Sequence, residues 1–401
     1  MPGLLDIGLT AILVTSCVIL TAAALLVLLL RQARERKIAR RRANPAGDYA
    51  VRTRWAPSTT STLNFSSFVY MDVDGDGKYG LADRPMAGIM VRLFDERGVF
   101  VKAARSNNGG FANFTMSTKR RRTALRVPGL YRFSVSVPPG WRASGANENQ
   151  SIRLHAAPES LVGLAGDSLP TPVGLVPGRY LAGRMPAAAQ ATLSVMGKGE
   201  VLESRTLAPG SSFRVDLAGA ADAVEISGGG FDRRLALSAY PTDLGLLSPG
   251  SVAPDAPLRT IGFDDVTRRS LRKVPCGHAG LDWRNLNAMS RDNTRNSEGY
   301  VNGNVSGDHI AYTSSGHPAE FGRDRPFGFH SVMLTAAWLA CEGEIALVES
   351  WLGEELLRSD EITLSALTPR HYAPMLEAVT RVRLSTRHHW QLVVDDLVLV
   401  L

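Results

Sequence analysis

The sequence predicts a mainly β protein with one N-terminal transmembrane helix followed by two or three tandem β-sandwich domains, the last of them jelly-roll-like. The chain has 401 residues, and its 38 glycines and 22 prolines lie among short apolar runs, which is typical of many turns between short strands. Apolar side chains alternate with polar ones at a period of two in several of these runs. Helical periodicity beyond residue 42 is confined to a few turns.

The one long apolar segment is Ile7–Leu30, whose 24 residues carry no charged side chain. As a helix it would rise about 36 Å, enough to cross a hydrocarbon core of roughly 30 Å with some tilt. A cleavable signal peptide is the alternative, but the segment is longer than the usual apolar stretch of about 7–15 residues and no basic residue precedes it. Residues 1–42 are therefore expected to form a membrane anchor with a basic flank.

The positive charge of the chain is concentrated directly after this segment. Residues 31–42 carry seven Lys and Arg against Glu35 alone, a local charge of +6 within a total of +7. The rest of the chain is therefore nearly neutral and lacks the broad cationic face that nucleic-acid binding requires. A basic run beside an apolar span favours contact with anionic lipid headgroups instead.

Residues 43–62 are polar, contain two prolines and are expected to form a linker. A first β unit is expected over 63–158, where Ile89, Val91 and Leu93 fall on one face of a strand. Alternation over 131–137 marks a second strand of that unit.

Two further β units are expected, over 159–250 and 251–401. In the former, alternation over 213–217 and 235–237 between glycine turns predicts a small β-sandwich without a chemical motif. The latter ends in apolar runs typical of strands, and within it Glu354–Leu367 suits either a short helix or a strand pair.

The sharpest chemical signal is a tight loop with carboxylates at alternate positions and a further aspartate at position twelve. Alternate carboxylates converge on one point, Gly77 allows the chain to reverse, and hard oxygen ligands at this spacing suit Ca²⁺. An EF-hand loop would end in Glu between two helices, but here both flanks resemble strands. The expected ligands are Asp72, Asp74, Asp76, the carbonyl of Lys78, and Asp83. The alternative is a solvated acidic turn without metal.

This loop and its surroundings, over about 63–143, resemble the B-type repeats of staphylococcal Sdr adhesins, which belong to a prealbumin-like, Cna-B-like class. The matching features are Tyr70, the alternate aspartates, Pro85, the Gly110-Phe111 turn and the strand Gly129–Phe133. The resemblance implies a stalk-like β-sandwich rigidified by Ca²⁺, without catalysis. Gly80 stands where the family often has an acidic ligand, and Asp83 is shorter than the usual Glu. Both departures predict weaker calcium binding.

Weak calcium binding bears on the location of the chain. Outside the cytoplasm, where Ca²⁺ is plentiful, sites of about 10⁻⁴–10⁻³ M affinity suffice. The basic run argues the opposite, because the positive-inside rule would keep the chain beyond residues 31–42 in the cytoplasm. Large domains can translocate despite such charge. We expect a single-pass membrane protein with most of the chain in the periplasm or at the cell surface.

The C-terminal unit, over about 260–399, resembles the β-sandwich core of PEP-CTERM-type exported bacterial proteins, which are similar in shape to carbohydrate-binding jelly rolls. The motifs that carry the resemblance are Phe263-Asp264-Asp265, Gly280–Trp283, Gly299–Gly303, Val305–Asp308, Leu334–Trp338 and Val394–Leu397. The Pro-Glu-Pro sorting tail of that class is absent from this sequence, and the N-terminal anchor would replace it.

The first and last strands of a jelly roll commonly lie side by side, which would bring Asp264 or Asp265 close to Asp395 or Asp396. Carboxylates that close need a cation or protons. A second structural Ca²⁺ is therefore expected at these four residues, with solvent exposure of the aspartates as the alternative.

Several aromatic residues of this unit would either stack on sugar rings or fill the core. They are Trp283, Trp338, Trp351, Trp390, Tyr300 and Tyr312. Cys276 and Cys341 would form one disulfide or stay two separate buried thiols.

The sequence carries no recognisable catalytic motif. Asp282, His309 and Glu320 could form an acid–base set, but their spacing does not require one. The expected function is a bacterial envelope or surface protein that displays non-catalytic modules, the last of which binds glycan or matrix. The alternatives are a structural component of an envelope or polysaccharide-export complex and a glycan-acting enzyme.

Overall fold

The structure is a computed structural model that describes Leu29, Leu30, Gln32 and residues 64–115, 128–157, 163–251, 257–268, 270–290 and 298–401. The chain divides into two units, Met1–Ser58 and Thr59–Leu401. In the first, Leu29, Leu30 and Gln32 are helical and exposed. The rest of the expected membrane span, together with the linker 43–62, lies outside the described residues. None of the helices within the described ranges is long and apolar enough to cross a membrane.

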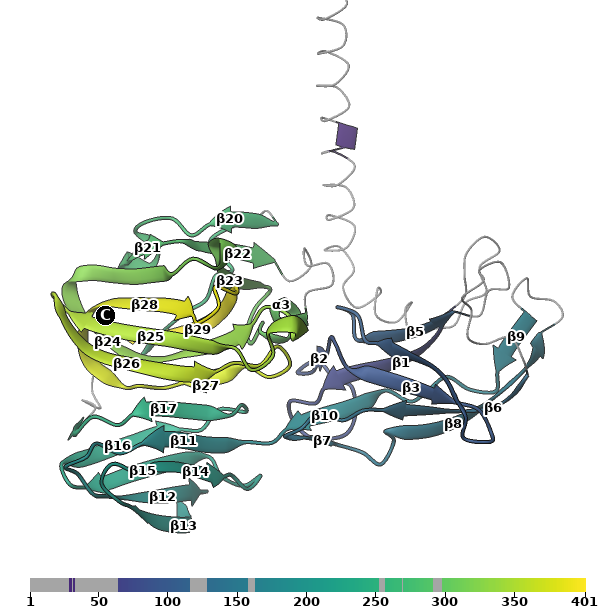
Figure 1. Cartoon of the computed structure of the whole chain (residues 1–401), viewed down its shortest axis with the longest axis horizontal. Helices are drawn as coiled ribbons and strands as arrows, with labels where there is room; N and C mark the ends of the chain where they lie inside the picture. The colour runs from purple at the N-terminus through teal and green to yellow at the C-terminus, as the bar shows by residue number, and fades with distance from the viewer. Residues whose placement is uncertain are drawn as a thin grey trace, which may run out of the picture. The chain divides into compact units, whose positions relative to one another are not determined.

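Strands dominate the second unit, which confirms the mainly β fold class (Figure 1). One five-stranded sheet has the order β4 (Phe100–Arg105), β3 (Met90–Phe94), β6 (Gly129–Val135), β8 (Asn149–Ala157) and β9 (Gly163–Gly166). Another joins β2 (Arg84–Pro85), β1 (Asn64–Met71), β10 (Val173–Pro177) and β7 (Trp141–Ala143), and β5 (Phe111–Thr115) also pairs with β1.

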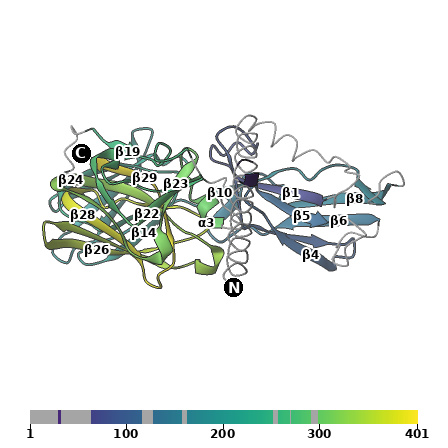
Figure 2. The ribbon, with the colours of Figure 1, turned by 90° about the horizontal axis from the view of Figure 1, so that it is seen from above.

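These two sheets share an aromatic core, and their strands β1, β5 and β6 lie together in both views (Figures 1 and 2). Phe133 of β6 packs against Phe65 of β1 at 5.1 Å and against Phe114 of β5 at 5.5 Å between ring centroids. The predicted alternation is confirmed, because Ile89, Val91 and Leu93 are all buried. It also holds over 131–135, whereas residue 137 is only half-buried.

Gly110 closes the turn before β5 in a conformation that other residues rarely adopt. Its φ is +79°, and a Cβ atom there would lie 2.5 Å from the carbonyl oxygen of Val69. Glycine at this position therefore lets the turn approach β1 closely.

A third sheet has the order β13 (Glu200–Leu207), β12 (Ala191–Gly197), β15 (Ala223–Gly228), β16 (Phe231–Ala236) and β18 (Gly250–Ser251). Its buried Leu193 and Ile226 pack in one core with Leu181, Val215 and Leu244. Those three residues come from β11 (Tyr180–Arg184), β14 (Ser212–Asp216) and β17 (Thr242–Leu246), which belong to the fourth sheet.

The fourth sheet has fourteen described strands. From β14, β11 and β17 it continues through β27 (Arg370–Tyr372), β24 (Ala319–Ala336), β29 (Leu392–Val400), β23 (His309–Thr313), β22 (Leu286–Ser290) and β20 (Leu271–Lys273). Its remaining strands are β19 (Arg259–Ile261), β21 (Asp282–Arg284), β25 (Ile345–Leu352), β26 (Glu355–Thr363) and β28 (Leu376–Thr386). Figure 2 shows β22, β23, β24, β28 and β29 close together.

Short helices connect some of these strands. They are the α-helix α3 (Glu298–Asn302) and the 3₁₀ turns η1 (His278–Gly280), η3 (Ser314–Gly316) and η4 (Leu339–Cys341). The stretch Glu354–Leu367, which suited either a helix or a strand pair, contains the single strand β26, whose partner β25 precedes the stretch.

Strand pairing crosses the predicted domain boundaries at 158 and 250. β10 pairs in parallel with β1, and β17 pairs in parallel with β27. The hydrogen-bonded sheets therefore connect the three predicted units, and the division into separate domains stays a prediction.

The expected pairing of the first and last strands of the C-terminal unit is confirmed, because β19 pairs with β29 and Thr260 lies opposite Val398. Both cysteines of this unit are free thiols. Cys341 is buried, as one alternative expected, whereas Cys276 is exposed.

Candidate functional site

The acidic loop lies at the tip of a β-hairpin. β1 ends at Met71 and β2 begins at Arg84, and these two residues pair in antiparallel register. Residues 72–83 therefore close the hairpin, and their ends are fixed by the sheet. Asp72 is fully buried and Asp83 is 7% exposed, whereas Asp74 and Asp76 are exposed.

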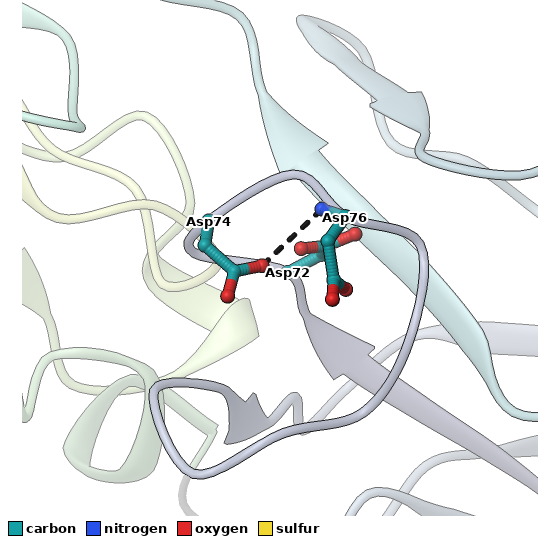
Figure 3. Close-up of side chains that lie close together, drawn as sticks. All are labelled: Asp72, Asp74 and Asp76. Carbon is teal, nitrogen blue, oxygen red and sulfur yellow. Dashed lines mark hydrogen bonds between the residues drawn. The ribbon is translucent and has the colours of Figure 1, made fainter.

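Three of the five predicted ligands converge. One carboxylate oxygen each of Asp72, Asp74 and Asp76 lies within 4.8 Å of the others (Figure 3). The loop is shaped around Asp72, which accepts hydrogen bonds from the N–H groups of Gly75 at 2.7 Å and Gly77 at 2.9 Å. Backbone N–H groups of the loop itself therefore hold Asp72 in place.

Asp83 and Lys78 take a different place in the loop. Asp83 accepts hydrogen bonds from the N–H groups of Val73 at 2.9 Å and Gly80 at 2.7 Å, and so ties the beginning of the loop to its end. Lys78 is exposed, and its N–H donates to Asp76 Oδ1 at 2.7 Å. Asp83 does not belong to the converging group of three acids found among the described residues, and the role of the Lys78 carbonyl stays a prediction.

The pKa values of Asp72 and Asp83 are shifted in opposite directions. Burial alone would raise the pKa of Asp72, but the nearby Ser144 hydroxyl and the N–H groups of Gly77 and Gly75 lower it below its ordinary value. Burial raises the pKa of Asp83, and the charges of Asp72 and Asp74 add to this rise. The charged form of Asp83 is therefore disfavoured in the metal-free loop, and a nearby cation would favour it.

Two buried hydroxyl oxygens beside the loop, Tyr70 Oη and Ser144 Oγ, have no hydrogen-bond partner. Burial and the charges of Asp72 and Asp83 raise the pKa of Tyr70 to about 12, so its hydroxyl stays protonated. Gly174 on β10 leaves room for both, because a Cβ there would lie 2.2 Å from Ser144 Oγ and 2.8 Å from Tyr70 Oη. Sequence reasoning missed Ser144 and Gly174, which approach the loop only through the pairing of β1 with β10 and of β10 with β7.

An aromatic cluster supports the base of the loop. Phe68, Tyr70 and Phe111 are buried together. The ring of Tyr79, from the loop itself, packs edge-on against Phe68 at 4.9 Å and against Tyr70 at 5.1 Å. The second half of the loop is thereby anchored to the sheet.

The four aspartates predicted to share a second calcium ion have separate partners. Asp264 accepts hydrogen bonds from the N–H groups of Asp308 and His309, and exposed Asp265 lies 3.8 Å from His278 Nε2. Asp395, only 1% exposed, accepts from the N–H groups of Val305 and Ser306. Asp396 accepts from the hydroxyl of Ser306.

Loop 303–308 therefore lies between Asp264 and the pair Asp395–Asp396. Its backbone N–H groups donate to Asp264 and Asp395, and Gly307 allows the close approach to Asp264 with a φ of +56°. Over the described residues, the three acids at 72, 74 and 76 form the group suited to a metal ion. Our calcium proposal below concerns the first loop, and a second ion at the four aspartates stays a prediction.

The aromatic residues of the C-terminal unit separate into three environments. Trp283 belongs to the core at 5% exposure, and Trp351 lies under the guanidinium of Arg381 at 4.6 Å. The others form one group, which we term the aromatic surface: Tyr300, which is buried, Tyr312 and Trp338, which are half-buried, and Trp390, which is exposed. Trp390 is its most accessible member at 40% exposure.

The three residues considered for acid–base chemistry do not form one site. Asp282 and Glu320 line the same pocket, but His309 is buried beside Asp264, with Nδ1 at 3.2 Å from Asp264 Oδ1. The histidine that would make a proton-transfer set is thus held elsewhere.

No family model and no curated protein matches this chain. Solved structures that resemble it include the K1 cleaved adhesin domain of Lys-gingipain from Porphyromonas gingivalis, with 13% identity and a TM-score of 0.23 over 36% of this chain and 97% of that chain. CBM51 from Clostridium perfringens GH95, in complex with methyl-galactose, matches with 13% identity and a TM-score of 0.21 over 35% and 99%.

BcpA, the major pilin subunit of Bacillus cereus, matches with 8% identity and a TM-score of 0.18 over 82% of this chain and 59% of that chain. This chain thus spans less than two thirds of that pilin. Similarity this low carries no argument about the ligand or function of the chain.

Proposed function

We propose that this chain is a membrane-anchored envelope or surface protein that displays non-catalytic β modules outside the cytoplasm. The acidic hairpin loop binds Ca²⁺ and stiffens the first β region, and the C-terminal strands bind glycan or matrix. The anchor is Ile7–Leu30, which is long enough and apolar enough to span a bilayer.

The observation that carries the proposal is the convergence of Asp72, Asp74 and Asp76 on one point of a loop held by paired strands. Oxygen donors in a flexible, oxygen-rich loop suit Ca²⁺ better than a softer metal. Asp83 and the Lys78 carbonyl would complete the ligand set, with Ser144 and Tyr70 offering further oxygens. The ion would offset the mutual repulsion of these carboxylates and tie the two ends of the loop together.

Calorimetry of the full chain with Ca²⁺ and with EDTA tests this part of the proposal. An ion that binds only the folded state stabilises it by about 2.7 kcal/mol when its free concentration is 100 times Kd. We expect chelation to lower the melting temperature and the double variant Asp74→Asn/Asp76→Asn to abolish this effect. Asp216→Asn/Asp232→Asn, which removes the same charge from exposed strand positions, is the matched control. A transition that EDTA leaves unchanged would contradict calcium binding.

Location can be tested through the one exposed thiol of the described C-terminal strands. Cys276 is exposed and Cys341 is buried, so a membrane-impermeant maleimide should label Cys276 on intact spheroplasts. The hydrogen bond to Asp282 raises the pKa of the Cys276 thiol, and labelling is therefore best done at alkaline pH. Cys276→Ser should remove the signal. Labelling that appears only after permeabilisation would place these strands inside the cell and contradict the proposal.

A further inference from the structure

A pocket of about 350 Å³ opens on the fourth sheet, away from the loop and from the aromatic surface. Its walls come from β21, β24, β28 and the turn between β25 and β26. The volume is at the lower end of the range for small-molecule sites, roughly 300–1,000 Å³. Strand pairing fixes three of its four walls.

Charged groups of both signs line this pocket. The carboxylates are those of Asp282, Glu320, Asp324 and Glu354, and the guanidinium groups are those of Arg284, Arg323 and Arg381. Arg284 and Glu320 are 3.7 Å apart, a loose pair, and Asp282 accepts a hydrogen bond from the Cys276 thiol at 2.7 Å. Arg381 Nε is buried without a hydrogen-bond partner.

The backbone holds these side chains in place. Strand β24 pairs with β28 at Gly322 opposite Arg381, and the next pair is Phe327 opposite Val379, so residues 323–326 project from the ladder. Arg323 is fixed within that bulge, because its guanidinium donates to the carbonyl oxygens of Arg325 and Pro326 at 3.1 Å each.

The opposite rim is equally ordered. The N–H of Gly353 donates to Thr380 Oγ1 at 2.8 Å, which ties the turn between β25 and β26 to β28. The guanidinium of Arg381 rests on the ring of Trp351, which limits its movement. A pocket with walls fixed in this way loses little entropy on binding.

The mixture of positive and negative charges indicates which class of ligand fits the pocket. A carboxylate only accepts hydrogen bonds and a guanidinium only donates them, whereas a hydroxyl group does both. An anion would meet four carboxylates and a cation would meet three guanidinium groups. A neutral ligand with many hydroxyl groups can bond to every member of the set, and each such bond is charge-assisted.

We propose that this pocket binds one unit of a neutral glycan. The inference rests on the proposed function, in which the C-terminal strands bind glycan or matrix, and it names the surface and the class of ligand. Glu320 and Arg381, from neighbouring strands, face the ligand as acceptor and donor. The aromatic surface plays no part in this binding.

The test uses the full chain in detergent on an array of neutral, carboxylated and sulfated oligosaccharides, followed by titration calorimetry with the best-bound neutral one. Glu320→Gln and Arg381→Lys should each weaken binding by at least about tenfold, because each removes a charge-assisted or bidentate contact. Glu361→Gln and Arg259→Lys, matched exposed positions of the same sheet, should leave affinity unchanged. Melting temperatures confirm that each variant is folded.

The outcomes separate this inference from the function on which it rests. Glycan binding that is lost in Trp390→Ala but kept in Glu320→Gln and Arg381→Lys would overturn the pocket while supporting the proposed function. Binding to sulfated oligosaccharides alone would overturn the neutral class. An array without any binding would overturn both, and stable membrane partners that co-purify with the chain would then favour an assembly role.

Discussion

At the scale of single residues, Asp395 shows how burial and hydrogen bonding compete over one carboxyl group. Burial and the neighbouring charge of Asp396 raise the pKa of Asp395 to about 8, although N–H groups of Ser306, Val305 and Asp396 oppose the rise. The folded chain therefore retains a proton at neutral pH that the unfolded chain, with an ordinary pKa of 3.8, has lost.

The stability of the chain should consequently depend on pH through Asp395. Between the unfolded pKa of 3.8 and the folded pKa of about 8, unfolding releases a proton. Stability should then fall as pH rises through this window, by about 1.4 kcal/mol per pH unit from this group. Urea unfolding between pH 5 and 8 should show a shallower pH dependence for Asp395→Asn than for the natural chain. Parallel curves for the two proteins would show that Asp395 does not hold the proton.

The raised pKa of Asp83 predicts that calcium affinity, and not only stability, depends on pH. Because its pKa is raised above the ordinary value in the calcium-free loop, the ion must compete with a proton at acid pH. Calcium affinity measured by titration calorimetry should fall as pH drops from 7 to 5. Asp83→Asn should weaken binding by at least about tenfold and remove most of that pH dependence. An affinity of the natural chain that is equal at both pH values would contradict a ligand role for Asp83.

At the scale of elements, a buried ion pair within β26 joins this strand to β17 through hydrogen bonds to backbone groups. The side chains of Arg358 and Asp360 are 2% and 4% exposed, and the guanidinium donates to the carboxylate and to the Leu244 carbonyl. Asp360 also accepts from the N–H of Leu246 at 3.0 Å and from the Tyr372 hydroxyl at 2.7 Å. The hydrogen-bond donors to this carboxylate thus all come from strands of the fourth sheet: Arg358, Leu246 and Tyr372.

Breaking this pair from one side should be costly. Arg358→Met leaves the charge of Asp360 buried without a counter-charge, and we expect a loss of about 3–5 kcal/mol in the free energy of unfolding. The exposed pair Arg387–Glu361, 2.8 Å apart, provides the control, since Arg387→Met should cost less than about 1 kcal/mol. Chemical denaturation measures both. Equal effects at the two sites would mean that the buried pair contributes no more than a surface contact.

Features that depend on residues close together in the chain could be predicted from the sequence. Alternation identified the buried face at Ile89, Val91 and Leu93 because the period of a strand is a local property. The alternate aspartates could also be recognised from the sequence, since all three lie within five residues. Ser144 and Gly174 could not be foreseen, because only parallel pairing of β10 with β1 brings them to the loop.

The aspartates at 264, 265, 395 and 396 show what could not be predicted from the sequence. The pairing of β19 with β29 was predicted correctly, but it does not decide what the nearby carboxylates bind. Loop 303–308 supplies backbone N–H groups to Asp264 and Asp395, and backbone groups carry no residue-specific signal in a sequence. Likewise, the pocket charges on β21, β24 and β28 are ordinary strand residues until the bulge at 323–326 brings them around one cavity.

At the scale of the whole molecule, contacts beyond the sheets connect the hairpin of the acidic loop to the C-terminal strands. The side-chain amide of buried Asn302 forms two hydrogen bonds with the backbone of Ala87. Its Oδ1 accepts from the N–H of Ala87 at 3.0 Å, and its Nδ2 donates to the Ala87 carbonyl at 3.1 Å. Arg84, the first residue after the loop, donates to the carbonyl of Asn304. Asn302 and Asn304 of the C-terminal unit therefore hold the chain that leaves the acidic loop. A calcium ion that stiffens the loop should also stiffen this contact.

Asn302→Ala tests this connection. The substitution leaves the buried N–H and C=O of Ala87 without their partners, and each such group costs about 1–3 kcal/mol. We expect the 64–177 strands of the variant to melt separately from the C-terminal strands, giving two calorimetric transitions or a broadened one, and proteolysis of the native state to begin nearer the acidic loop. Asn285→Ala serves as the control: this amide donates only to the neighbouring carbonyls of Ser314, His317 and Pro318, so it should lower the transition without splitting it. A single sharp transition in Asn302→Ala at an unchanged temperature would show that the sheet pairing alone couples these regions, and that calcium at the loop acts only on its own hairpin.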